Sequence, residues 1–308
     1  MTRVVCIVGP TASGKSALAL ELADRLGGEI VSADSRQIYR GLDVGTAKPT
    51  PAERVRIPHH CLDLVDPGES FDVARFRTAA AGAIAAIAAR GHVPLVVGGT
   101  GLYVRALLRG LCPAPPRAPA LRAELEAAVA AEGSAALHRR LAALDPAAAA
   151  RVAPRDTVRI VRALEVALAT GVPLSRWQAE HRFAERPYDA LVIGLARPTA
   201  ELDARIAARA NAMVAAGFLD EVRALVARGV VVDAVGYREM LACVDGRTDV
   251  ATAVAATVRA TRRCAKRQRT WFRREPDVVW HHPEADVDAI VAATTAFVAA
   301  PGRRAAHA

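Results

Sequence analysis

Short apolar runs alternate with stretches of helical periodicity in the first third of the chain. The runs at 3–8, 29–35 and 93–101 end in polar residues or glycines, which predicts three short buried strands. Residues 15–27 and 71–91 instead repeat their apolar side chains at helical spacing. Strands that alternate with helices predict an α/β fold, in which helices cover both faces of a parallel sheet.

The pattern changes in the middle of the chain. Residues 112–120, with the sequence CPAPPRAPA, predict a linker, and the pattern from 121 to 180 is almost wholly helical. A strand pattern then returns. We therefore expect an all-helical insertion domain at 113–188, within an α/β core formed by 1–112 and 189–308.

The last part of the chain resumes the alternation of the core. Helices are predicted at 199–229, with a break near Gly217, and at 250–274. A final strand is predicted at 277–282. The tail from 301 is rich in small and polar residues and is expected to be disordered.

The composition permits a large folded core and makes the chain basic. Hydrophobic residues make up 52% and charged residues 24% of the 308 positions, which excludes wholesale disorder. The formal net charge of +9 suits a polyanionic partner such as a nucleic acid, but also a generally basic surface. No apolar stretch is long enough to cross a membrane, so we expect a cytoplasmic protein.

Cysteines and paired histidines are the remaining candidates for metal binding. The five cysteines are scattered and form no C-x-x-C pair, which favours reduced thiols over a disulfide framework or a zinc site. The pairs His59–His60 and His281–His282 have no ligand cluster around them in the sequence. We expect these pairs at turn or edge positions.

The first predicted strand leads directly into the sequence GPTASGKS at 9–16. It fits the P-loop pattern G-x-x-x-x-G-K-[ST]. Glycines let the backbone wrap closely round an anion with its N–H groups pointing inward, and the following helix adds its N-terminal partial positive charge. Lys15 is expected to neutralise phosphate oxygens and Ser16 to bind Mg²⁺. The core is therefore predicted to be P-loop NTPase-like.

Two features argue against nucleotide hydrolysis as the task of this loop. No N-K-x-D segment for guanine recognition occurs, and the strand at 93–101 ends without the acidic residue that holds Mg²⁺ in ATPases. Asp34 instead lies at the end of the second apolar run, where it either caps the next helix or acts as a general base or metal ligand. Because ligands bind beyond the carboxyl ends of parallel strands, 9–16, 34–37 and 98–101 should gather at one edge.

Taken together, the motifs of the chain resemble those of the tRNA dimethylallyltransferase family, in its bacterial form. The segments that carry the resemblance, in their usual order, are GPTASGKS, DSRQIYRGLDVGTAKP, VGGTGLY, RALEVALATGVPLS, VGYREM and AKRQRTWFR. The resemblance implies transfer of a dimethylallyl group from dimethylallyl diphosphate to N6 of the adenosine 3′-adjacent to a tRNA anticodon, with Mg²⁺ as cofactor. Its implied partners are the donor and the tRNA anticodon stem-loop. We expect a monomer with no obligatory protein partner.

The resemblance also implies roles for individual residues. Asp34 is similar to the general base, Arg209 to the arginine that steadies the leaving diphosphate, and Thr100 to a residue where tRNA and diphosphate meet. The implied diphosphate loop comprises Gly9, Thr11, Ala12, Ser13, Gly14, Lys15 and Ser16. The implied tRNA contacts are Asp34, Ser35, Arg36, Gln37, Thr100, Arg122, Arg159, Arg162, Gly236, Tyr237, Arg238, Lys266, Arg267, Gln268, Arg269, Trp271 and Arg273. Because Arg205 and Arg209 are four residues apart, they should share one face of a helix, which is either functional or merely solvated.

A basic segment stands out by its composition alone, independently of the family resemblance. Residues 262–274, RRCAKRQRTWFRR, hold seven basic residues in thirteen, together with Trp271 and Phe272. Basic side chains bind phosphates and aromatic rings stack on splayed-out bases, although an amphipathic helix with packed aromatics gives the same pattern. We expect both: an aromatic residue packs and the arginines face RNA. Cys264 stands where the family often has an aromatic residue, and we interpret it as a small packing residue.

Three alternatives remain open at this point. An adenylate isopentenyltransferase uses the same donor but needs neither the helical insertion nor the basic segment. A P-loop small-molecule kinase is the second alternative. A nucleic-acid-binding P-loop protein without transfer chemistry is the third, and it leaves Asp34 without a role.

Overall fold

The computed structural model describes residues 1–300, so the tail from 301, which we expected to be disordered, lies outside the described residues. Contacts divide the chain into two compact units, Met1–Leu108 with Arg186–Ala308, and Arg109–Glu185. The sequence predicted these two breaks after 112 and after 188. In both divisions a helical unit interrupts the α/β unit.

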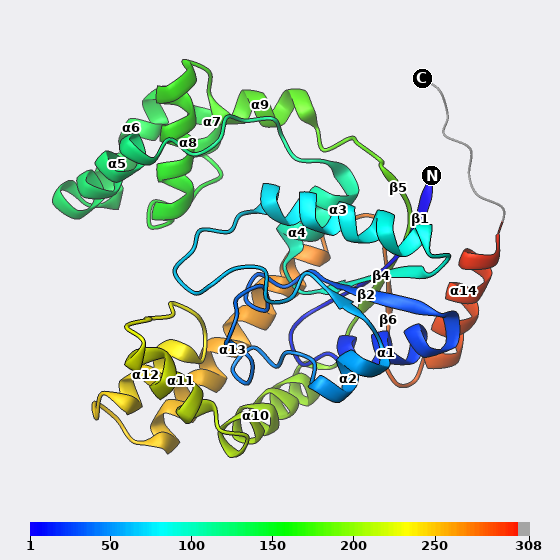
Figure 1. Ribbon diagram of the computed structural model, residues 1–308. Helices are drawn as coiled ribbons and strands as arrows, with labels where there is room; N and C mark the ends of the chain where they lie inside the picture. The colour runs from blue at the N-terminus through cyan, green and yellow to red at the C-terminus, as the bar shows by residue number, and fades with distance from the viewer. Residues whose placement is uncertain (301–308) are drawn as a thin grey trace. The chain divides into compact units, whose positions relative to one another are not determined.

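A six-stranded parallel sheet forms the centre of the first unit, in the order β3–β2–β4–β1–β5–β6 (Figure 1). Its strands are β1 (Thr2–Val8), β2 (Gly28–Ser32), β3 (His59–His60), β4 (Val93–Gly98), β5 (Tyr188–Leu195) and β6 (Val278–His281). Every neighbouring pair is parallel, so the carboxyl ends of all strands lie at one edge. This sheet confirms the predicted α/β fold, and β3 shows that His59 and His60 occupy an edge strand.

Helices cover both faces of the sheet, as the nearly continuous apolar strands require. The helices of this unit are α1 (Lys15–Leu26), α2 (Pro51–Arg56), α3 (Val73–Ala89), α4 (Gly101–Arg109), α10 (Thr199–Ala215), α11 (Phe218–Ala227), α12 (Tyr237–Val244), α13 (Val250–Phe272) and α14 (Val287–Ala299). Side chains of β1 alternate between the two faces: Cys6 packs with Phe76 of α3, while Ile7 packs with Leu22 of α1 and Ile290 of α14. The sheet is thus a rigid base for whatever its carboxyl edge carries.

A third apolar cluster joins α11 and α12 to the start of the long basic helix α13. Phe218 and Val222 of α11, Tyr237 and Met240 of α12 and Ala253 of α13 are buried together. The cluster also includes Leu42, from the loop that follows β2. This packing holds the segment between β2 and α2 against α11 and α12.

The second unit is all-helical, as predicted. It consists of α5 (Pro119–Glu132), α6 (Ser134–Leu144), α7 (Pro146–Ala149), α8 (Thr157–Thr170) and α9 (Leu174–His181). Leu125, Leu137, Leu141, Ile160 and Leu164 form its core. None of the helices in the described part of the chain is long and apolar enough to cross a membrane.

Candidate active site

The loop between β1 and α1 has the backbone that a phosphate cradle needs. Gly9 has φ 145°, and a Cβ on it would lie 2.7 Å from the carbonyl oxygen of Leu195. Gly14, with φ 106°, forms the left-handed N-cap of α1. Both positions therefore require glycine. Arg197, whose guanidinium is buried, donates its Nε–H to the carbonyl oxygen of Ser13 at 3.1 Å and braces the outer side of the loop.

Lys15 is the first charged group of this site. Its Nζ donates to the carbonyl oxygen of Pro10 at 2.7 Å. Burial, together with the positive charge of Arg209, lowers the pKa of Lys15 from 10.5 to about 8, although the carboxylate of Asp34 acts in the opposite direction. Two cations and one carboxylate thus share a desolvated site, which favours the entry of an anion.

Arg209 reaches the loop from α10. Its Nη1 donates to Thr11 Oγ1 at 3.3 Å, and its Nη2 donates to the carbonyl oxygen of Thr46 at 3.5 Å. One turn earlier, Arg205 Nε donates to the carbonyl oxygen of Ala12 at 3.0 Å. The two arginines therefore share the face of α10 that contacts the loop, and the face is not merely solvated.

Asp34 lies two residues beyond the end of β2. Its Oδ1 accepts the backbone N–H of Arg36 at 2.8 Å, so the carboxylate stabilises a turn, and no helix follows directly. The side chain also lines two cavities, described below. The local and the functional interpretations of Asp34 are therefore compatible.

Thr100 ties the ends of β2 and β4 together. Its Oγ1 accepts the backbone N–H of Ser35 at 3.1 Å, and its own N–H donates to the carbonyl oxygen of Ala33 at 3.2 Å. The strands approach closely here because Gly98 has no side chain: a Cβ on it would lie 2.1 Å from the oxygen of Ala33. The predicted gathering of 9–16, 34–37 and 98–101 at one edge is confirmed.

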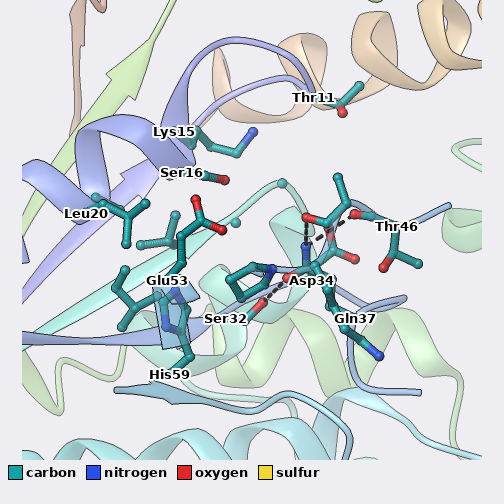
Figure 2. A pocket seen from close by; sticks show the side chains of 18 of the residues that line it. Thr11, Lys15, Ser16, Leu20, Ser32, Asp34, Gln37, Thr46, Glu53 and His59 are labelled. Atoms are coloured by element: carbon teal, nitrogen blue, oxygen red, sulfur yellow. Dashed lines mark hydrogen bonds between the residues drawn. The ribbon is translucent and has the colours of Figure 1, made fainter. Parts of the chain in front are cut away.

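Two cavities meet at this edge. The first, of about 420 Å³, is lined by Lys15 and Ser16 of the loop, and Figure 2 shows them on one side with Asp34 and Thr46 opposite. The second, of about 370 Å³, is lined by Ser35 and Thr100. Both are lined by Thr11, Asp34, Thr46, Gly99, Arg209 and Gln268. A ligand held by the loop and a ligand in the second cavity would therefore face each other across Asp34 and Arg209.

Comparison with known proteins identifies the family. A family model described as IPP transferase matches residues 37–275, and one described as isopentenyl transferase matches residues 2–59. A tRNA dimethylallyltransferase of Anaeromyxobacter dehalogenans is 57% identical over 292 residues, which cover 94% of this chain and 97% of that protein. The chain belongs to the IPP transferase family.

Solved structures agree with this assignment. The crystal structure of the full-length tRNA isopentenylpyrophosphate transferase from Bacillus halodurans is similar to this IPP transferase with a TM-score of 0.71 and 39% identity, covering 97% of both chains. A eukaryotic dimethylallyltransferase captured acting on tRNA gives a TM-score of 0.80 at 25% identity, covering 97% of this chain and 80% of that one. The resemblance inferred from the motifs is confirmed.

One anchor of the site in this IPP transferase was missed in the sequence. The carboxylate of Glu221, on α11, accepts the backbone N–H groups of Asp43, Val44 and Gly45 at 2.9, 2.7 and 3.1 Å, and the hydroxyl of Tyr237 at 2.6 Å. It fixes the loop that carries Thr46, part of the wall between the cavities. No motif marks Glu221, since its partners lie far away in the sequence.

Gln268 makes a contact that the sequence pattern does not indicate. We expected it to contact tRNA, and here its Oε1 accepts the backbone N–H of Thr11 at 2.8 Å. The side chain fits there because Gly99 is a glycine: a Cβ on Gly99 would lie 2.3 Å from Gln268 Nε2. Helix α13 is thereby joined directly to the phosphate loop.

The basic helix α13 packs an aromatic residue into the core, as predicted, and exposes several of its basic residues. Phe272 is buried in the core, and Trp271 packs beside it with the Arg105 guanidinium 4.3 Å from its ring centre. Lys266, Arg267 and Arg273 are exposed. Arg269 is partly buried, and its Nη1 donates to Thr199 Oγ1 at 3.0 Å. Cys264 lines the second cavity, and burial raises the pKa of its thiol.

The other candidates for tRNA contact differ in how much of the side chain is accessible. Gly236 and Tyr237 are buried, and Arg238 is exposed. In the helical unit, Arg159 is exposed, whereas Arg122 and Arg162 form ion pairs with the buried carboxylate of Glu165. The positive charges of Arg122 and Arg162 are therefore partly neutralised by Glu165 within this unit.

Proposed function

We propose that this IPP transferase moves the dimethylallyl group of dimethylallyl diphosphate to N6 of the adenosine 3′-adjacent to the anticodon in tRNA. The products are N6-dimethylallyladenosine and diphosphate. The names of the relatives support tRNA prenylation as the class of reaction. The observation that carries the finer proposal is the shared wall of the two cavities, where Asp34 and Arg209 face both.

The first cavity suits the donor. Backbone N–H groups of the loop, the ammonium of Lys15 and the guanidinium of Arg209 surround the place where the diphosphate would lie. These groups would stabilise the negative charge that grows on the leaving oxygen as the allylic C–O bond breaks. The same cradle that holds a nucleotide in other proteins thus serves a leaving group here.

Magnesium fits the same cavity. Ser16 offers a hydroxyl oxygen there, and Mg²⁺ prefers oxygen donors together with phosphate oxygens of the substrate. When bound, Mg²⁺ would supply further neutralisation of the diphosphate charge.

The second cavity suits the acceptor adenosine. As the C–O bond breaks, the nitrogen lone pair of N6 forms the new C–N bond, and the amine proton passes to the carboxylate of Asp34. Thr100 and Ser35 line this cavity beside Asp34 and would orient the base. Since a base inside a stem-loop cannot reach a cavity while stacked, the adenosine must leave its stack.

The exposed basic residues of α13 would bind phosphates of the anticodon stem-loop. We expect the enzyme to act as a monomer and the helical unit to contact tRNA as well. Lys266 and Arg267 present their charges on α13, and Arg273 follows at its C-terminal end, where they are available for phosphate contacts. Free adenylate as acceptor is disfavoured because a mononucleotide needs neither this helix nor the insertion. A kinase is disfavoured because β4 ends in Gly98 without a following acidic residue.

The experiment supplies purified protein with isotope-labelled dimethylallyl diphosphate, Mg²⁺, unmodified tRNA, AMP and ATP in one mixture. We expect label in the tRNA fraction alone. Label in AMP, or consumption of ATP without labelled RNA, would contradict the proposal.

A further inference from the structure

A second acidic side chain, besides that of Asp34, lines the donor cavity. Among the described residues that line this cavity, the acidic ones are Asp34 and Glu53. Figure 2 shows the carboxylate of Glu53 directed into the cavity on the side of Ser16. Neither the motifs nor the family assignment gives Glu53 a role.

One oxygen of Glu53 is already engaged in local structure. Glu53 Oε2 accepts the backbone N–H of Thr50 at 2.7 Å and its hydroxyl at 2.8 Å, while Glu53 N–H donates to Thr50 Oγ1 at 3.2 Å. This capping box begins α2 and fixes the position of the carboxylate. No hydrogen bond in the described part of the chain uses Oε1, which leaves that oxygen for a ligand.

The surroundings of Ser16 lack the carboxylate that usually accompanies a P-loop serine. β4 ends in Gly98, and the residues that follow it, Gly99 and Thr100, carry no acid. Asp34 must keep its carboxylate free to accept the N6 proton, because a carboxylate bound to a cation is a weak base. Glu53 is then the carboxylate of this cavity that remains for a cation.

Building on the proposed function, we propose that Glu53 supplies the protein carboxylate of a Mg²⁺ site whose other ligands are the Ser16 hydroxyl, diphosphate oxygens and water. Mg²⁺ in proteins is held by one or two carboxylates plus substrate phosphates, and it keeps several waters. No group of three or more His, Cys, Asp or Glu side chains that could bind a metal occurs in the described residues. The ion should therefore bind only together with the diphosphate.

The test measures equilibrium binding of Mn²⁺, as a paramagnetic stand-in for Mg²⁺, by electron paramagnetic resonance with and without inorganic diphosphate. Wild-type protein should bind the ion only when diphosphate is present. Glu53→Gln should lower the affinity for the ion about tenfold or more. Because Gln also forms a capping box, the Tm of the Glu53→Gln variant should stay near that of the wild type. The Thr50→Ala variant should have a lower Tm but bind the ion as tightly as the wild type.

Two results overturn the proposal alone: Glu53→Gln binds the ion as tightly as wild type, or Asp34→Asn rather than Glu53→Gln loses it. Failure of wild-type protein to bind diphosphate at all overturns both this proposal and the proposed function. If ion binding follows the prediction but labelled tRNA never forms, the metal site holds and the proposed function fails.

Discussion

At the residue scale, the proposed chemistry depends on Asp34. One of its oxygens stabilises a turn through Arg36, yet the carboxylate also lines both cavities. Its place was predictable because the carboxyl ends of parallel strands meet at one edge. The hydrogen bonds of Thr100 at this edge depend on the close approach of the backbone at Gly98. A strand pattern in the sequence does not reveal such a contact.

Replacing Asp34 tests its assignment as the base. Asp34→Asn keeps the size of the side chain and an oxygen for the turn, but it cannot take up the N6 proton. We expect the rate of transfer to fall by about 10²–10⁴, the usual contribution of a general base, while tRNA affinity stays unchanged. Single-turnover transfer and filter binding measure the two quantities. Near-normal transfer by Asp34→Asn would remove the assignment.

At the scale of elements, the strands and helices that build the site were largely predictable, and the contacts between them were not. β1, β2, β4 and α13 follow from apolar periodicity. Glu221 and Gln268 act on the backbone of residues 178 and 257 positions away, at Asp43 and Thr11. Such contacts depend on how α11 and α13 pack, and periodicity along one element carries no information on that.

Helix α13 makes a separate prediction about RNA binding. Lys266 and Arg267 are exposed, so the double variant Lys266→Ala with Arg267→Ala should lose two phosphate contacts. The slope of log K for tRNA binding against log salt concentration should then become less steep by about 2. The matched control is Arg25→Ala with Arg223→Ala, which removes the same charge from exposed ion pairs on α1 and α11. An equal change of slope in both double variants would show a nonspecific charge effect.

At the scale of the whole molecule, acid stability should depend on a buried carboxylate away from the site. Glu29 of β2 accepts hydrogen bonds from Arg90, His60 and His92 at 2.7, 2.6 and 2.7 Å. Burial opposes ionisation of Glu29, but these bonds outweigh it and lower the pKa from 4.5 to about 2. The group links β2 to β3 and to the turn before β4.

Because the pKa of Glu29 is lowered on folding, its contribution to the free energy of unfolding is fully present above pH about 4.5 and is lost as the pH falls toward about 2. Glu29→Gln should therefore be less stable at neutral pH and lose less stability across this range. Urea unfolding at several pH values measures this difference. Glu21→Gln, in the exposed pair with Arg25, is the control. Parallel pH profiles for Glu29→Gln and wild type would contradict the prediction.

The central claim is that the phosphate loop presents a prenyl donor to one exocyclic amine. The most direct measurement uses two anticodon stem-loops that differ at one position, the nucleoside 3′-adjacent to the anticodon: adenosine in one, purine riboside without the amine in the other. With labelled dimethylallyl diphosphate, nucleoside analysis should find N6-dimethylallyladenosine from the first RNA and no label in the second. Equal labelling of both RNAs, or of neither, would contradict the account.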